Sequence, residues 1–369
     1  MHTAISPSSF ERRLLCYGSY FAEKDLPDVT SIYADEGTLL HKVMEQISTK
    51  GKYDEDIILT SEQQEIIEYT IKLLDKYNGN SFFNYYEYEV DLSFLGIDMK
   101  GTCDRVILEP SFYDSNANEY TKPVLHIIDY KFGKGIKVDV KNNYQLALYA
   151  MGTLKEFHDH EYFYDADINN NGFREVKVVL HIVQPYLNNY QTIELSSSDY
   201  LFNIDFYVNI IKKCLDENAI RTPNEKACRF CKAKINCPAL KNIIPTNFEI
   251  NKSDEELKII LDNKNLIINY LKSLEEHIKN RIEEGEKFKG YTIRKKNTNR
   301  TWNKDAYEVL TSILQDDAFE KKLIGITKAE RLIGKEIINT ITEKKEGEYE
   351  LVNDNLENEK IISEFKIEI

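Results

Sequence analysis

The spacing of apolar residues predicts helices in the first eighty residues and strands in the residues that follow. Apolar side chains recur at helical intervals in residues 6–15, 35–48 and 60–79. From residue 82 the period shortens to two, and the aromatic-rich stretch 82–96 alternates as a half-buried strand does. The N-terminal part is therefore expected to be helical and to lead into a sheet.

Further segments extend this prediction into a mixed sheet. We expect a hairpin turn near Leu95–Gly96 and a loop over residues 111–122. Residues 123–133 form the most apolar strand and are expected to be central. The expected strands after the first are 97–110, 123–133, 174–185 and 190–196, and the expected intervening helices are 142–157 and 197–218. The predicted fold class is therefore α/β.

The chain changes character near residue 245. Residues 251–286 are charged and helical in pattern, as one long helix or two, and a short helical piece follows at 327–336. The tail from residue 343 is charged and weakly patterned. We expect a core domain over residues 1–245 and a mainly helical C-terminal extension over residues 246–369.

Composition narrows the class of protein. The net charge of -14 argues against coating nucleic acid by bulk charge, but it permits a local metal-bridged site. No apolar run approaches the roughly 18–20 residues that span a membrane, and the first residues lack the pattern of a signal peptide. The expected location is the cytoplasm, with no membrane partner.

The segment IIDYKFGKG places two ionised side chains, Asp129 and Lys131, in an apolar strand. Residues two apart on a strand share a face, and Asp104 of GTCD is expected close to Asp129 on a neighbouring antiparallel strand. Two carboxylates beside an ammonium suit Mg²⁺ or Mn²⁺, and the lysine can orient the bound water, help to deprotonate it or neutralise developing charge. The alternative is a structural salt bridge between Lys131 and either aspartate.

Other polar residues are candidates for the same site. His41, on the helix of EGTLLH, is either a further metal ligand or an ordinary helix-face residue. Gln145 and Tyr149 lie four apart on the helix after Asp129, where they either contact a phosphate or nucleobase or form a hydrogen-bonded packing face. Glu36, Glu87 and Glu89 are weaker candidates for the same site. Alternation along the strand places Glu87 and Glu89 on one face.

Three cysteines crowd into CRFCKAKINCP, as Cys228, Cys231 and Cys237. In a cytosolic protein such spacing indicates metal binding rather than disulfides. A fourth ligand is needed, and Cys16 is the candidate. The C-x2-C half-site by itself favours zinc. Cys103 and Cys214 are not part of this expected ligand group, and they are expected to be buried as small hydrophobic residues.

His41, the Asp104 strand, DYK and QLALY, in this order, resemble the PD-(D/E)xK nuclease superfamily in its RecB-like exonuclease branch. The resemblance implies a restriction-endonuclease-like core, a mixed central sheet flanked by helices, that cuts DNA with divalent metal. It implies these roles: metal ligands His41, Asp104, Asp129 and the Ile128 main-chain carbonyl; catalytic lysine Lys131; accessory pair Gln145 and Tyr149.

The cysteines strengthen the resemblance. RecB-like exonucleases with an iron–sulfur cluster carry one cysteine before the GxxxH helix and three after the last core helix, as this chain does with Cys16 and then Cys228, Cys231 and Cys237. A structural 4Fe–4S cluster is therefore implied, with zinc as the alternative. Over residues 6–238 the pattern is most similar to a phage-associated RecB-like family of uncharacterised function. This similarity implies a place in DNA replication or recombination, alongside other phage proteins in the host cytoplasm.

A basic segment lies outside the expected core. Residues 287–304 hold seven Lys or Arg and no Asp or Glu, with Tyr291 and the single Trp302 interleaved. It is predicted either to follow a DNA backbone or to form a solvated turn whose tryptophan packs on the long helix. The candidate DNA contacts are Lys134, Arg294, Lys295, Lys296, Arg300 and Trp302.

Three functions are consistent with these patterns. The first is a metal-dependent DNA nuclease, an exonuclease acting on ends or single strands. The second is a catalytically silent DNA-binding or recombination accessory protein with the same fold. The third is a zinc-stapled interaction protein, for which the convergence of His41, Asp104, Asp129 and Lys131 would be coincidental.

Overall fold

The computed structural model describes residues 5–27, 32–79, 83–111, 113–116, 118–157, 176–244, 253–294, 311–313 and 324–343. The chain separates into two compact units, Met1–Phe248 and Glu249–Ile369. The boundary between the units, after residue 248, lies close to residue 245, where the sequence pattern put the end of the core domain. Each unit is described by itself.

A five-stranded mixed sheet forms the centre of the first unit, in the order β1-β2-β5-β6-β7. β5 and β6 run parallel, and the other neighbours run antiparallel. The bounds are β1 Phe83–Asp91, β2 Lys100–Glu109, β5 Val124–Tyr130, β6 Lys177–Gln184 and β7 Asn189–Ser196. The prediction of an α/β fold is confirmed, and β5 is central and almost entirely buried, as its apolar composition indicated.

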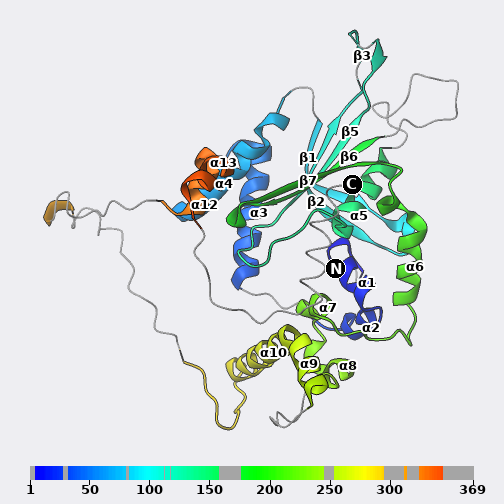
Figure 1. Ribbon diagram of the computed structural model, residues 1–369, viewed down its shortest axis with the longest axis vertical. Helices are drawn as coiled ribbons and strands as arrows, with labels where there is room; N and C mark the ends of the chain where they lie inside the picture. The colour runs from blue at the N-terminus through cyan, green and yellow to red at the C-terminus, as the bar shows by residue number, and fades with distance from the viewer. Residues whose placement is uncertain are drawn as a thin grey trace. The chain divides into compact units, whose positions relative to one another are not determined.

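Helices cover both faces of this sheet (Figure 1). On one face lie α3 (Ile32–Lys50) and α4 (Ser61–Leu74), over a core that includes Leu40, Ile107 and Ile128. We call this the α3-side core. The other face carries the α5-side core, which includes Val106, Leu125 and Ile127. The helices of that face are α1 (Phe10–Leu15), α5 (Tyr144–Glu156) and α6 (Ile204–Cys214).

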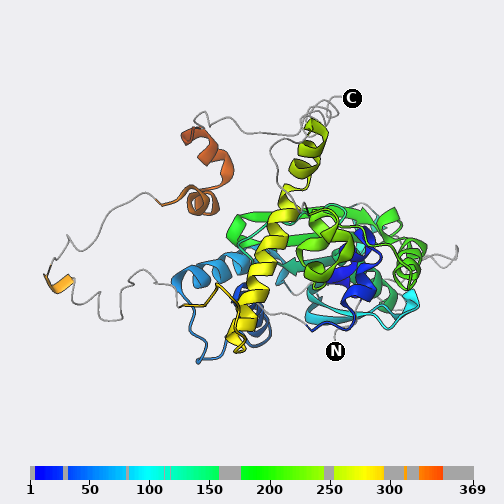
Figure 2. The same cartoon turned by 90° about the horizontal axis from the view of Figure 1, so that it is seen from below.

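The view in Figure 2 shows the same separation of α3 and α4 from the N-terminal helix α1. The parallel pair β5 and β6 is joined through α5, as a crossover connection requires. Asn143 caps α5 by accepting a hydrogen bond from the N–H of Leu146 at 3.1 Å. This cap fixes where α5 begins, and therefore where Gln145 in its first turn is held.

The structure corrects several expected boundaries. Residues 111–122 contain a two-stranded ribbon, β3 (Tyr113–Asp114) and β4 (Glu119–Tyr120), rather than only a loop. The helix expected from residue 197 begins at Ile204, because Asn203 caps it by accepting hydrogen bonds from two main-chain N–H groups. The expected turn before β2 is present, with Gly96 in the left-handed region at φ 87°.

The second unit is helical where it is described. The charged stretch forms two helices, α9 (Asp254–Asp262) and α10 (Lys264–Glu283). Two short helices follow, α12 (Ile326–Ile333) and α13 (Lys335–Ile341). The expected helical extension is therefore confirmed for these residues. In the part of the chain that the structure describes, every helix is too short or too polar to cross a membrane.

Candidate metal centre

Three carboxylates form a row across neighbouring strands. Glu87 of β1 lies opposite Asp104 of β2. This follows from the strand register, which pairs Tyr86 with Arg105 and Tyr88 with Cys103. The β2–β5 register ends at Arg105 and Ile128, and one step further it places Asp104 beside Asp129. The sequence predicted the Asp104–Asp129 approach, and the register adds Glu87.

The backbone of β1 is kinked at Glu87, whose φ is 46°. Tyr85 and Tyr88 pack against the α5-side core. Tyr86 lines a pocket beside α3 and α4, and Glu87 lies near His41 of α3. Two consecutive residues of β1 therefore turn toward α3, which normal alternation forbids.

The same break occurs opposite, in β2. Cys103 and Val106 belong to the α5-side core, whereas Asp104 lies near His41 and Arg105 lines the pocket beside α3. Both paired strands therefore break their alternation at the same point, and the pairing of their residues is unchanged on either side of it. This break brings the acid pair, Glu87 and Asp104, to the α3 side together.

Alternation predicted that Glu87 and Glu89 share a face, and the packing of Tyr88 and Val90 on the α5 side agrees with this, but the two carboxylates have different neighbours. Glu89 is exposed, and its carboxylate lies 2.9 Å from the ammonium of Lys100. Glu87 instead belongs to a trio with His41 and Asp104 whose ligand atoms all lie within 4.8 Å of one another. Alternation alone could not separate the two acids, because they differ in their tertiary neighbours and not in the face of β1 from which they extend.

His41 lies beside Asp104, with Nδ1 3.3 Å from Asp104 Oδ1. Its ring also meets the ring of Phe132 edge-on, at a centroid distance of 5.1 Å. Burial lowers the pKa of His41, but the hydrogen bond and charge of Asp104, followed by the charges of Asp129 and Glu87, raise it above its ordinary value overall. The imidazole is therefore held in a strongly anionic setting.

Asp104 also organises the strands. Its Oδ2 accepts a hydrogen bond of 2.5 Å from the main-chain N–H of Tyr130. This contact lies just past the end of the β2–β5 ladder, where a strand N–H has lost its regular partner. The carboxylate thus replaces a backbone acceptor and is fixed in position by the sheet.

The buried Asp129 and the partly exposed Lys131 form an ion pair held by Gln145. Lys131 Nζ lies 2.8 Å from Asp129 Oδ2 and donates to Gln145 Oε1 at 3.2 Å. Gln145 Nε2 donates to Asp129 Oδ1 at 2.8 Å and is 3.2 Å from the hydroxyl of Tyr149. The structure therefore contains both features that the sequence left as alternatives: a salt bridge between Lys131 and Asp129, and a hydrogen-bonded face formed by Gln145 and Tyr149.

Burial dominates the electrostatics of this pair. Burial raises the pKa of Asp129, with Asp104 adding to the shift and Lys131 opposing it. Burial lowers the pKa of Lys131, but the charge and hydrogen bond of Asp129 raise it overall. Asp129 Oδ2 is buried and has no partner in good hydrogen-bond geometry, despite the short approach of Lys131 Nζ. One oxygen of the central carboxylate is therefore incompletely satisfied.

Gly101 explains how Tyr149 reaches the site. A Cβ at this position of β2 would lie 2.7 Å from Tyr149 Cε1 and 2.8 Å from the ring of Pro7. The glycine of GTCD therefore provides room for Tyr149 to pack across the strand beside the two aspartates. Burial also raises the pKa of Tyr149 well above its usual range, so this hydroxyl stays protonated.

Two expected participants have other contacts. The main-chain carbonyl of Ile128 lies 3.7 Å from Cys103 Sγ, which can donate to it. Glu36 accepts hydrogen bonds from Gln63 Nε2 at 3.2 Å and from the Tyr186 hydroxyl at 3.0 Å. Glu36 therefore lies outside the trio, in a polar network of its own.

The candidate DNA contacts are only partly described. Lys134 is 2.8 Å from Glu62 and 3.8 Å from Glu36, so its charge is already neutralised by carboxylates. Arg294 is exposed. The remaining candidates lie outside the described residues: Lys295, Lys296, Arg300 and Trp302.

The four cysteines that the sequence analysis selected line one small pocket. Cys16 is separated from the other three by more than two hundred residues along the chain. Cys16 follows α1, and Cys228, Cys231 and Cys237 lie in and around α7 (Glu225–Arg229). All four are buried. The main-chain N–H of Thr222 donates to Cys16 Sγ at 3.2 Å, which is the type of contact that stabilises a thiolate.

The sulfur spacing bears on the kind of metal group. Among the described residues, the only trio of His, Cys, Asp or Glu ligand atoms found within 4.8 Å of one another is that of His41, Glu87 and Asp104. No three of the cysteine sulfurs are therefore that close. Around tetrahedral zinc, with Zn–S near 2.3 Å, the sulfurs lie about 3.8 Å apart. The pocket is thus wider than a preformed zinc site.

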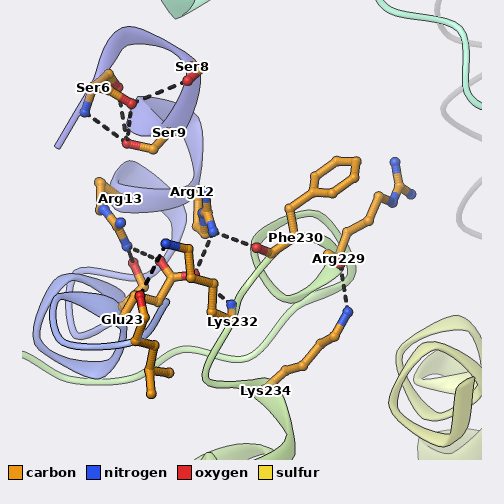
Figure 3. Close-up of polar contacts among 12 residues, drawn as sticks. Ser6, Ser8, Ser9, Arg12, Arg13, Glu23, Arg229, Phe230, Lys232 and Lys234 are labelled. Atoms are coloured by element: carbon orange, nitrogen blue, oxygen red, sulfur yellow. Dashed lines mark hydrogen bonds and ion pairs between the residues drawn. The ribbon is translucent and has the colours of Figure 1, made fainter. Parts of the chain in front are cut away.

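A buried ion-pair network fastens the same region, and the sequence analysis did not anticipate it (Figure 3). Glu23 accepts from Arg12 Nη1 and Arg13 Nη1, each at 2.5 Å, and from the main-chain N–H of Lys232 at 2.7 Å. Arg12 Nη1 also donates to the Phe230 carbonyl. The N-terminal helices are thereby joined to the cysteine segment by protein contacts alone.

The other two cysteines are buried, as expected. Cys103 packs in the α5-side core, and Cys214 Sγ lies 3.6 Å from the Arg13 carbonyl. Arg105, which follows Asp104, is a functional candidate that the sequence analysis missed. It is buried, donates to Asn84 and Asn78, and lines a pocket of about 320 Å³ beside α3 and α4.

Comparison with known families adds one finding. Residues 2–357 match the model of a family described as "Protein of unknown function (DUF2800)". The match spans both units and includes the metal centre and the cysteine pocket.

Proposed function

The chain belongs to the DUF2800 family, and we propose that it is a metal-dependent DNA nuclease that hydrolyses phosphodiester bonds. One observation carries the proposal. His41 and Asp104 adjoin an Asp129–Lys131 ion pair that Gln145 holds in place. A structural salt bridge needs neither the imidazole nor a row of carboxylates.

The donor set fits a divalent cation. The row supplies carboxylate oxygens, His41 supplies a nitrogen, and Asp129 Oδ2 is buried without a hydrogen-bond partner. Mg²⁺ and Mn²⁺ favour such oxygen-rich surroundings. When bound, the cation would polarise the phosphodiester and lower the pKa of water.

Lys131 supplies the positive charge of the protein itself. Its ammonium lies between Asp129 Oδ2 and Gln145 Oε1 and is about one third exposed. An ammonium fixed in this way can neutralise charge that develops on the phosphate or hold the attacking water by hydrogen bonding. Burial lowers the pKa of Lys131, and the charge and hydrogen bond of Asp129 raise it overall.

Gln145 and Tyr149 act as positioning residues. The Gln145 amide donates to Asp129 and accepts from Lys131, which fixes the relative orientation of the two charged groups. Tyr149 is 3.2 Å from the same amide and restricts its rotation. A residue that orients the ligands of a metal by hydrogen bonding typically contributes about 10–100-fold to affinity or activity.

The cysteine pocket supports the second part of the proposal, a structural 4Fe–4S cluster held by Cys16, Cys228, Cys231 and Cys237. Four buried sulfurs that are wider apart than a zinc tetrahedron suit the larger group. Such a cluster would link the chain before α3 to the chain after α6 and thereby close a loop of more than two hundred residues.

The proposed substrate is DNA with ends or single strands, and the proposed setting is DNA replication, recombination or repair of a phage or bacterium. The overall charge of -14 supports binding through a local site rather than through the whole surface. The basic segment of residues 287–304 is the proposed additional contact for the DNA backbone.

The test uses end-labelled single- and double-stranded DNA, Mg²⁺ or Mn²⁺, and anaerobically purified full-length protein. The parent protein is expected to release nucleotides or short products. Asp129→Asn, which keeps the shape and one hydrogen-bond acceptor, is expected to bind DNA without cutting it. DNA binding by the parent without cleavage in either metal would contradict the nuclease and favour an accessory role.

A further inference from the structure

We propose that Glu87 is a metal ligand, and that it forms with His41 and Asp104 a cation site that prefers Mn²⁺ to Mg²⁺. The inference rests on the proposed function for its role in catalysis, but the binding site itself is argued from geometry. Neither the strand pattern nor the resemblance to other nucleases assigns Glu87 this role.

The distances support a single cation. The ligand atoms of His41, Glu87 and Asp104 lie within 4.8 Å of one another, and His41 Nδ1 is 3.3 Å from Asp104 Oδ1. Ligand atoms at right angles around a small cation lie about 3 Å apart, since the metal–oxygen distance is about 2.1 Å. Glu87, which is exposed, is the member whose side chain can rotate to close this gap.

The third aspartate is less available. Asp129 Oδ1 accepts from Gln145, and Asp129 Oδ2 faces the Lys131 ammonium at 2.8 Å. Asp129 Oδ2 is nevertheless buried without a hydrogen bond, next to Asp104 in the row of carboxylates. Its ionic partner is Lys131, and one ammonium cannot also neutralise Asp104 and Glu87, so this edge of the row keeps an excess of negative charge that a cation would offset.

The charges give the same result. Glu87, Asp104 and Asp129 carry three negative charges when ionised, and Lys131 neutralises one of them. His41, the histidine of the trio, lies with Nδ1 3.3 Å from Asp104 Oδ1. A divalent cation between His41, Glu87 and Asp104 would neutralise the remainder without displacing Lys131.

The ligand types set the metal preference. An imidazole nitrogen with two carboxylates is a mixed donor set, and imidazole binds later transition metals and Mn²⁺ better than it binds Mg²⁺. Mg²⁺ prefers an all-oxygen octahedron and retains its water molecules. The presence of His41 in the trio therefore favours Mn²⁺.

The test measures Mn²⁺ binding to the metal-free full-length protein by titration calorimetry, without DNA. Glu87→Gln removes the charge, and Glu87→Gly removes the side chain at a position whose φ of 46° suits glycine, so loss of fold is avoided. The matched control is Glu89→Gln, two residues along the same strand, where the carboxylate pairs with exposed Lys100.

The parent and Glu89→Gln are expected to bind Mn²⁺ equally, and more tightly than they bind Mg²⁺. Both Glu87 variants are expected to lose affinity by about tenfold or more. Parental affinity in both Glu87 variants, absence of binding in the parent, or tighter binding of Mg²⁺ would each overturn the proposal. This binding test contains no DNA and is therefore independent of cleavage. If the protein binds Mn²⁺ through Glu87 but cuts no DNA, the nuclease proposal is refuted and the assignment of Glu87 as a metal ligand stands.

Discussion

Asp104 Oδ2 accepts a 2.5 Å hydrogen bond from the main-chain N–H of Tyr130, immediately after the Asp129 that it faces across the strands. The other oxygen, Oδ1, lies 3.3 Å from His41 Nδ1. One carboxylate therefore links β2, β5 and α3. The position of the candidate metal centre therefore depends on the sheet itself.

The hydrogen bonds of Gln145 predict a loss of catalysis without a loss of DNA binding. Gln145→Leu keeps the volume but removes both the donor to Asp129 and the acceptor for Lys131. We expect the cleavage rate constant to fall by about 10–100-fold, with the dissociation constant for DNA unchanged. Tyr149→Phe is expected to cost less, because the hydroxyl meets the site only through Gln145.

Single-turnover cleavage and DNA titration check this prediction, and the pH profile adds a second readout. Removing Gln145 changes the environment of the Asp129–Lys131 pair, so the profile should shift. An unaltered rate and profile in Gln145→Leu would show that the amide only fills space.

The cysteine pocket predicts a difference between two classes of cysteine. Cys228→Ala is expected to lose iron and labile sulfide, and to unfold at a lower temperature, because one of four ligands is missing. Cys214→Ala is the control, since Cys214 is buried outside this pocket. Metal analysis after anaerobic purification would contradict the assignment if the parent contained stoichiometric zinc and no iron.

The network around Glu23 predicts stability that does not depend on the cluster. Glu23→Gln leaves two arginines, one of them buried, without their carboxylate. We expect a loss of about 3–5 kcal/mol in the free energy of unfolding of the first unit. Glu11→Gln is the matched control, since its carboxylate pairs at the surface with Lys226, and should cost less than about 1 kcal/mol.

Urea unfolding of metal-free protein measures both variants. Similar stability of Glu23→Gln and Glu11→Gln would mean that the contacts of Glu23 do not stabilise the first unit.

Two buried histidines predict a loss of stability in mild acid. His126 Nδ1 lies 3.0 Å from His181 Nε2, and His181 Nδ1 lies 3.1 Å from the Tyr190 hydroxyl. Burial lowers the pKa of His126 to about 4 and that of His181 to about 3, and nearby Lys76 and Arg105 add to both shifts. Both side chains are therefore neutral in the folded protein at pH 5.

In the unfolded chain these histidines titrate near pH 6.5, so the unfolded state binds more protons below that pH. The free energy of unfolding should therefore fall as the pH drops from 7 to 5, by about 2 kcal/mol for each histidine. His181→Gln should reduce this dependence, whereas His277→Gln, on the exposed face of α10, should leave it unchanged. A flat stability profile in the parent over this range would contradict the burial of a neutral pair.

The order of elements and the central strand could be predicted from the sequence, because periodicity reports which face of each element is buried. Asp129 and Lys131 were identifiable because ionised residues in an apolar strand demand a partner. Cys16 was the candidate for the fourth ligand, and it lines the same pocket as the three clustered cysteines.

Glu87 could not be assigned to the site in the same way. Its position depends on a left-handed residue within a strand, and this breaks the alternation from which its neighbours were predicted. Glu23 was equally hidden, because its partners are separated from it by more than two hundred residues on one side. Both cases depend on tertiary contacts that local pattern does not encode.

The most direct test of the central claim is the rate of DNA cleavage with Mn²⁺ by the parent and by Lys131→Ala. Lys137→Ala is the control for charge, since Lys137 is exposed six residues along the chain. The account predicts cleavage by the parent and by Lys137→Ala, and a rate lower by about 10²–10⁴-fold in folded Lys131→Ala. Full cleavage by Lys131→Ala would contradict it.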